Sequence, residues 1–215
     1  MATAKGKTKV KAEVAVNPAA PAESAAVDTA GGSKRLAVCA YPGTGEQLGR
    51  VWEKMTGEDP LVMTVQRDSL FRDTLAEAVA NPDIADIFIL VPANCLPCAP
   101  ISLEELKGPF VFVDVSGSRH YCDRLPVLFN KESLVEALVS AEPGDDESFM
   151  QAYYKRNLHR PIEGGFRFGN LVTPVYRANP CENLVIEAFV RKKFVTASPD
   201  GYRAIAHLVD QYLLG

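Results

Sequence analysis

The sequence lacks any long apolar run and any framework of paired cysteines. No segment approaches the roughly 20 consecutive apolar residues that a membrane-spanning helix needs. Four lysines, at positions 5, 7, 9 and 11, interrupt any apolar signal-peptide core near the N-terminus. The five cysteines are odd in number and sparse, unlike the even, dense sets of secreted disulfide-rich domains. We therefore expect a cytoplasmic protein, in a cell or in a host cell, without a membrane span.

The chain also lacks the short motifs of the commonest catalytic and nucleotide-binding classes. It contains no Gly-X-Ser-X-Gly nucleophile elbow, and its glycines at 43 and 45 complete neither a Gly-X-Gly-X-X-Gly pattern nor a P-loop. The three histidines, His120, His159 and His207, have no spacing typical of catalysis. A net charge of −4 gives no general polyanion-binding signature, so we do not expect nucleic acid as a partner.

The composition changes near residue 34. Residues 1–34 contain no aromatic side chain and consist mainly of small residues, Pro and Lys, which bury too little apolar surface to offset the entropy of ordering. We predict a disordered tail, whose lysines leave a protein partner, phosphate or a membrane surface as alternatives to a solvated leader. With 47% hydrophobic and 23% charged residues in the chain, residues 35–215 are expected to form a single globular domain.

Beyond the tail, short apolar runs alternate with helix-like stretches. Strands are predicted at 36–41, 61–65, 87–91, 110–115 and 194–197, with an extended run at 171–176. Helices are predicted after the turn at 42–45 as far as Gly57, from an Asp68 N-cap to Ala80, and at 131–140, 146–157, 182–190 and 202–214. This order predicts an α/β fold, a three-layer and mainly parallel sheet flanked by helices.

The loop at residues 92–100 is the first candidate site, because chemistry in parallel α/β sheets gathers past the carboxyl ends of central strands. Cys95 and Cys98 form a Cys-X-Pro-Cys segment there, which resembles the thioredoxin active-site loop, where a helix N-terminus stabilises a thiolate. Thr173 and Pro174 would supply the opposing Thr/Pro pair. The later chain lacks the hairpin and closing helix of the thioredoxin fold, which argues against this interpretation. A redox function is therefore kept as an alternative only.

Two other ligand-binding interpretations use residues near that loop or beyond it. Cys95 and Cys98 could join His120 and Cys122 as a soft-metal site, but the pattern lacks a second Cys-X-X-Cys knuckle. We therefore favour cysteines that pack as small apolar groups. A basic cluster around the glycines at 164 and 165 could bind a phosphate or sugar-phosphate group, or form a solvated helix end: Lys155, Arg156, His159, Arg160 and Arg167.

Four segments between Arg67 and Leu214 resemble the stealth-like glycosyltransferases, a family of capsule-sugar and phage-encoded enzymes with a GT-A-like, nucleotide-sugar-binding fold. The segments are 69–75 (SLFRDTL), 81–90 (NPDIADIFIL), 121–131 (YCDRLPVLFNK) and 194–201 (FVTASPDG). The resemblance covers about two thirds of the chain. It implies a nucleotide-sugar-transferase-like fold, a nucleotide sugar as ligand, and Mg²⁺ or Mn²⁺ as the cofactor that the family uses.

The chain departs from this family where the metal would bind. The family places two adjacent acids after the central strand, because a hard cation prefers charged oxygen ligands. The matching positions here are Ala93 and Asn94, and the family's histidine is matched by Arg124. By this resemblance Arg124 would pair with a diphosphate, with Asp114 and Asp123 as the candidate acids. Asn94 would contact the nucleotide sugar, with Arg156 and Arg160 as further candidates from the basic cluster.

Three functions remain open on this basis. The first is a divergent glycosyltransferase that binds a nucleotide sugar with weak or no catalysis. The second is a non-catalytic structural or interaction protein, a pseudoenzyme encoded for example by a phage or a mobile element. If a phage encodes it, we expect it in the host cytoplasm or in the virion. The third is a thiol-redox or metal-binding protein that uses Cys95 and Cys98. An open cleft over residues 92–100 favours a ligand, and a filled one favours a scaffold.

Overall fold

The runs that the sequence marks as most apolar form the centre of the fold. A computed structural model describes residues 33–66, 71–106, 110–113, 116, 119–121, 125–140, 149–150, 153, 162–163 and 172–215. All of them belong to one compact unit, Gly31–Gly215. The described strands fall into three sheets, and the largest of these carries the candidate loop.

The largest sheet contains four described strands in the order β2-β1-β3-β7. Strand β1 (Lys34–Ala40) pairs in parallel with β2 (Leu61–Thr64) on one side and with β3 (Ile84–Val91) on the other, and β7 (Val127–Asn130) runs antiparallel beside β3. The chain thus goes from β1 to β2 on one side and returns to β3 on the other. The boundary between β1 and β3 is therefore a topological switch point.

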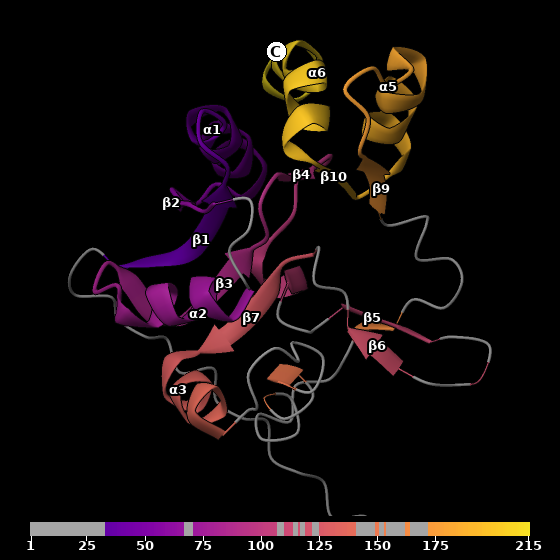
Figure 1. Ribbon diagram of the computed structural model, residues 1–215. Helices are drawn as coiled ribbons and strands as arrows, with labels where there is room; N and C mark the ends of the chain where they lie inside the picture. Colours follow the sequence, from indigo (N-terminus) through magenta and orange to yellow (C-terminus); the bar gives the residue numbers. More distant parts are fainter. Residues whose placement is uncertain are drawn as a thin grey trace, which may run out of the picture. The chain divides into compact units, whose positions relative to one another are not determined.

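Helices cover both faces of this sheet (Figure 1). Helix α1 (Gly45–Thr56) packs its Leu48, Val51 and Trp52 on one face. On the other face lie α2 (Phe71–Ala80) and α3 (Lys131–Ser140). Because successive strand residues point to opposite faces, β1 feeds Val38 into the first core and Cys39 into the second. This alternation explains why almost every residue of β1 and β3 is apolar.

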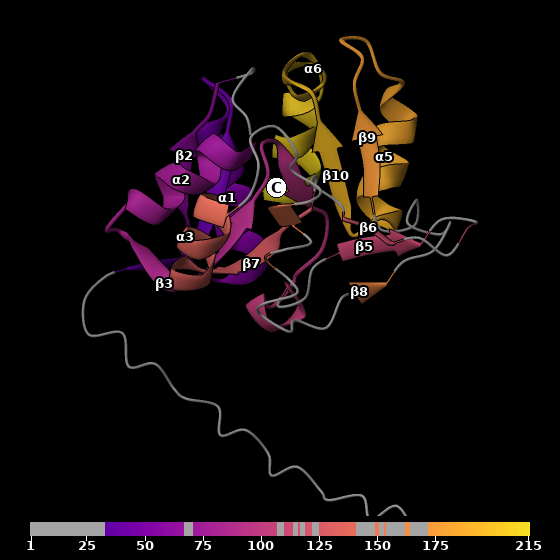
Figure 2. The ribbon, with the colours of Figure 1, turned by 60° about the horizontal axis from the view of Figure 1, so that its bottom comes forward.

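A second sheet extends the α1 side of the molecule. Its order is β4-β10-β9, with β4 (Cys95–Pro97) antiparallel and β9 (Val172–Val175) parallel to β10 (Phe194–Ala197). Helix α5 (Glu182–Arg191) precedes β10, and α6 (Pro199–Val209) follows it and ends in a π-helical turn, Asp210–Leu214. Figure 2 shows β9 and β10 side by side. Residues of α1, β10 and α6 share one apolar core.

The remaining described elements are short. Strand β5 (Phe110–Val113) pairs antiparallel with β6 (Arg119–Tyr121) and parallel with β8 (Ile162–Glu163), and a single 3₁₀ turn, η1, spans Leu103–Leu106. None of the helices in the described ranges is long and apolar enough to span a bilayer.

The predicted α/β class is confirmed, but the sheets are mixed instead of mainly parallel. Strand β7 enters the main sheet antiparallel to β3, and residues 95–97 form an antiparallel strand where the sequence predicted a loop. The helix at 131–140 and the strand at 194–197 have the predicted bounds. The Asp68 N-cap and most of the predicted helix at 146–157 lie outside the described residues. A three-layer, nucleotide-sugar-transferase-like arrangement stays a prediction.

Candidate functional site

The candidate site is the switch point, where β1 and β3 end and where α/β folds usually have a ligand-binding crevice. We call this place the crevice. Residues 41–44 connect β1 to α1, and residues 92–94 connect β3 to β4. The first turn requires Gly43, whose φ of 84° lies in the left-handed region that other residues avoid. Thr44 then occupies the N-cap of α1. Topology alone brings Thr44 and Asn94 to the same edge of the sheet.

Asn94 is the central residue of this crevice. Its φ of 54° makes it the one non-glycine residue with positive φ among those described, and Asn tolerates that conformation better than most side chains. Its side chain is 0% exposed. Its Oδ1 lies 3.0 Å from the Thr44 hydroxyl, and its backbone carbonyl accepts a 3.0 Å hydrogen bond from the Ala197 N–H. Asn94 therefore ties β3 both to α1 and to β10.

Counting protons favours the orientation of the Asn94 amide in which its NH₂ group, not its oxygen, faces Thr44. The Thr44 hydroxyl lies 2.9 Å from the Tyr41 carbonyl as well as 3.0 Å from Asn94 Oδ1, and its one proton serves only one of them. With the amide turned over, Asn94 Nδ2 donates to the hydroxyl, which then donates to Tyr41. In either orientation one end of the amide has no hydrogen-bond partner among the described residues.

The protein's own side chains fill the space around Asn94. Cys95 and Leu96 are 0% exposed, and the Trp52 indole N–H donates a 2.8 Å hydrogen bond to the Cys95 carbonyl. Thr196, which pairs with Cys95 across the sheet, and Tyr202 of α6 are also buried, and the described residues offer no partner to either hydroxyl. Burial, with a smaller contribution from Asp210, raises the pKa of Tyr202, so that its phenol stays neutral. In the described part of the chain the crevice is a packed core.

The two cysteines of the loop lack the environment of a reactive thiol. Cys95 lies in strand β4 instead of at a helix N-terminus, and neither Cys95 nor Cys98 is part of a disulfide. Burial raises the pKa of Cys98 to about 12, although a backbone hydrogen bond from Val195 lowers it slightly. Pro174 lies in β9, which β10 separates from β4. A thiol with such a pKa is protonated at neutral pH and is a poor nucleophile, which favours a packing role.

The other predicted site residues cannot be placed. The residues Asp114, Cys122, Asp123, Arg124, Lys155, Arg156, His159, Arg160 and Arg167 all lie outside the described part of the chain. His120 lies in β6, but its side chain is not described. Among the side chains that are described, no group of three or more His, Cys, Asp or Glu could hold a metal ion. Of the six predicted catalytic and cofactor-binding residues, Asn94 alone is therefore located.

Comparison with known proteins adds nothing to this geometry. No family model matches the chain, and neither does any curated protein. The resemblance to sugar transferases therefore stays a prediction from four short segments, and the function has to be argued from the site itself.

Sequence reasoning missed the residues that close the crevice. The predicted turn at 42–45 is confirmed at Thr44, but the sequence does not predict its bond to Asn94 and singles out neither Trp52 nor Thr196, although Trp52 is the only tryptophan of the chain. A lone tryptophan in an amphipathic helix is a usable signal, because large aromatic side chains dominate core packing. Thr196 offered no such signal, since its burial depends on pairing with Cys95, far away in the sequence.

Proposed function

We propose that the chain is a non-catalytic α/β protein of nucleotide-sugar-transferase type, and that it works by binding other macromolecules. The observation that carries the proposal is the closed crevice at Asn94. This residue stands where the resemblance expects a metal-binding acid, yet it is 0% exposed and its amide is held against Thr44. A side chain in that position holds the fold together instead of facing a substrate.

The chemistry of sugar transfer explains why this closure matters. A leaving diphosphate gains negative charge in the transition state, and the family's metal, bound by acids, stabilises that charge. Ala93 carries no ligand atom, and Asn94 offers a neutral amide that is already used inside the protein. Neither residue supplies the charged oxygens that a hard divalent cation prefers. Catalysis by the family's mechanism is therefore not expected.

A binding experiment tests this proposal directly. The full chain is titrated calorimetrically with UDP-, GDP- and CMP-sugars, with and without Mn²⁺, and donor hydrolysis is measured in parallel. We expect neither saturable heat nor turnover. Turnover that Asp114→Asn abolishes would contradict the proposal, because it would show a working acid at the predicted catalytic position. Glu187→Gln, at an exposed position of helix α5, is the control for an unspecific loss of charge.

One observation favours a second function, nucleotide-sugar binding without turnover. One end of the Asn94 amide has no partner among the described residues, and α1 and α6 both begin close to it. The N–H groups at helix N-termini attract phosphate. In this case the same titration gives saturable heat without turnover, and Asn94→Gly, which keeps the backbone conformation, weakens it. Heat that Asn94→Gly leaves unchanged would rule out binding in this crevice.

A further inference from the structure

The described surface is hollowed beside β2, at the edge of the main sheet. This open hollow has a volume of about 360 Å³ and lies between α1 and the segment from Asp59 to Thr64. Two features make it different from the crevice. Its floor includes an exposed apolar side chain, and its rim carries three carboxylates: Glu46, Glu53 and Asp59.

The floor exists because α1 has glycine at two successive turns. A Cβ on Gly45 would lie 2.9 Å from Val62 Cγ1, and one on Gly49 would lie 3.0 Å from Val62 Cγ2. The missing side chains let the helix backbone approach the strand closely. Val62 is nevertheless 37% exposed, because no described element covers its outer side. The result is an apolar strip along β2 that is open to solvent.

Strand β2 also presents unused backbone groups along this hollow. The N–H of Val65 donates to the Ala40 carbonyl at 2.9 Å. The backbone N–H and C=O groups of the odd-numbered residues in this segment therefore point to β1. In a parallel pair the direction alternates with each residue, and the N–H and C=O of Val62 and Thr64 point away from the sheet. No described residue forms a hydrogen bond with them. Such an edge is a template for an added strand.

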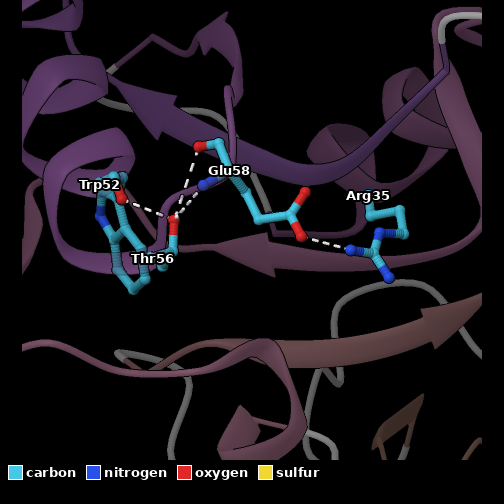
Figure 3. Close-up of polar contacts among 4 residues, drawn as sticks. All are labelled: Arg35, Trp52, Thr56 and Glu58. Carbon is cyan, nitrogen blue, oxygen red and sulfur yellow. Dashed lines mark hydrogen bonds and ion pairs between the residues drawn. The ribbon is translucent and has the colours of Figure 1, made fainter.

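The turn before β2 fixes the acidic end of the rim. Figure 3 shows the end of α1, where the Thr56 hydroxyl donates to the Trp52 carbonyl at 2.6 Å and accepts from the Glu58 N–H at 3.2 Å. Glu58 forms an ion pair with Arg35. The adjacent Asp59 forms one with Lys34. These contacts hold the chain so that Asp59 lies at the start of the edge strand.

The rim keeps an excess of negative charge. Asp59 is neutralised by Lys34, whereas Glu46 and Glu53 form no ion pair with any described residue. These two glutamates are seven residues apart on α1, which corresponds to about 10.5 Å along the helix. Alternate residues of a strand lie about 6.7 Å apart, and a lysine stem is long and flexible. Lysines at every second position of an added strand therefore reach both carboxylates.

We infer that the hollow binds an extended segment of a partner polypeptide, which adds a strand to β2 and carries lysine or arginine at alternate positions. Main-chain hydrogen bonds to Val62 and Thr64 give the affinity. The aliphatic stems of the basic side chains pack against the exposed Val62 side chain, and Glu46 and Glu53 bind their charged ends. This inference does not depend on the crevice being inactive, because it uses different side chains.

The probe for this site is a labelled peptide with the sequence of residues 5–11, which has lysine at every second position. Fluorescence anisotropy at low salt, with the full chain, is expected to show saturable binding. A peptide of the same composition with its lysines in one block should bind at least about fivefold more weakly, because it cannot place them on one face of a strand. Equal binding of the two peptides would overturn the inference.

Two variants separate charge recognition from strand addition. Glu53→Lys should weaken binding about tenfold, while the control Glu187→Lys, with the same change of charge on α5, should leave it unchanged. Thr64→Pro removes an N–H that points away from β1, so the strand keeps its pairing and peptide binding should be lost. Circular dichroism checks that this variant folds. If Glu53→Lys and Glu187→Lys bind equally, the contact is unspecific and the inference is wrong.

Discussion

The crevice beside Asn94 and the hollow beside β2 both border helix α1, yet they have opposite properties. In the crevice, the side chains of Asn94 and Thr44 are 0% and 6% exposed and interact with each other. In the hollow, an apolar side chain and two carboxylates that form no ion pair with a described residue face solvent. Topology marks the crevice as the place for chemistry, but side chains decide whether that place is open. Of these two places, the open one lies at the sheet edge.

This contrast has an energetic consequence. Residues that fill a packed core contribute strongly to stability, whereas exposed residues contribute little and can be changed for binding. Substitutions around Asn94 should therefore destabilise the fold, and substitutions in the hollow should change only what it binds. If large substitutions around Asn94 left the free energy of unfolding unchanged, the crevice would be a ligand-binding site and not a packed core.

The largest effect is expected for Trp52→Ala. The indole is 0% exposed, lies with its ring centroid 6.4 Å from that of Phe194, and bonds to the Cys95 carbonyl. Its loss leaves a cavity and removes a hydrogen bond to a buried carbonyl, so the free energy of unfolding should fall by about 3–5 kcal/mol. Urea denaturation followed by circular dichroism measures this, since the substitution also removes the only tryptophan fluorophore.

Trp52→Phe is the matched control for this substitution. It keeps most of the ring but loses the donor to Cys95, so a cost of about 1–2 kcal/mol is expected. A cost of less than about 1 kcal/mol for Trp52→Ala would mean that the wall of the crevice yields easily. The crevice would then have to be treated as a binding cleft.

The next largest effect is expected at Asn94. Asn94→Ala loses the bond to Thr44, and alanine tolerates a positive φ less well than asparagine. The free energy of unfolding should therefore fall by about 2–3 kcal/mol. Asn94→Gly loses the same bond without the strain, so it should cost about 1 kcal/mol less. The two variants are compared by urea denaturation. Equal costs would show that the backbone at this position is free to relax.

The local elements of the fold could be predicted from the sequence because their signals are local. Helix α1 follows the turn at Gly43 and ends at Gly57, whose N–H bonds to the Glu53 carbonyl at 2.8 Å. Helix α6 has Ser198 as its N-cap, with a 3.1 Å bond from the Gly201 N–H, and Pro199 at its start. The predicted helix began later, at residue 202, because its apolar stripe starts there.

The crevice could not be predicted in the same way, because distant residues build it. The sequence marks residues 95–97 as a Pro- and Cys-rich loop, and they become strand β4 only through pairing with β10, about 100 residues later. The burial of Asn94 likewise depends on Thr44 and Ala197. The location of the site followed from strand order alone, whereas its closure required these long-range contacts.

A third effect, which is small for each pH unit, is expected at alkaline pH. Burial, helped by the charge of Glu77, raises the pKa of Cys39 from 9.0 to about 12. The folded protein therefore keeps this proton above pH 9, while the unfolded chain loses it. The free energy of unfolding should fall by up to about 1.4 kcal/mol per pH unit between pH 9 and 12 on account of this thiol. Below pH 9 this contribution is constant.

Cys39→Ala isolates that contribution, because it removes the thiol and should make the fall of stability between pH 9 and 12 less steep. Cys98, beside the crevice, has its pKa raised in the same direction. Cys181 is exposed and should be the fastest to react with a thiol reagent among the three. Rapid labelling of Cys98 at neutral pH would support the redox alternative and would show that the crevice opens.

The smallest effect is expected in the hollow, for Gly49→Ala. Alanine gains about 1 kcal/mol over glycine within a helix, and the new Cβ meets Val62 Cγ2 at 3.0 Å. Val62 is partly exposed and can rotate away, so the stability should change by no more than about 0.5 kcal/mol.

Gly201→Ala is the matched control, because its Cβ would lie 2.1 Å from the Val175 carbonyl oxygen. The backbone at Val175 cannot move aside as a side chain can, so Gly201→Ala should lower the free energy of unfolding by about 3 kcal/mol. A similar cost at Gly49 would show that the floor of the hollow is as rigid as the crevice, and the contrast between the two regions would fail.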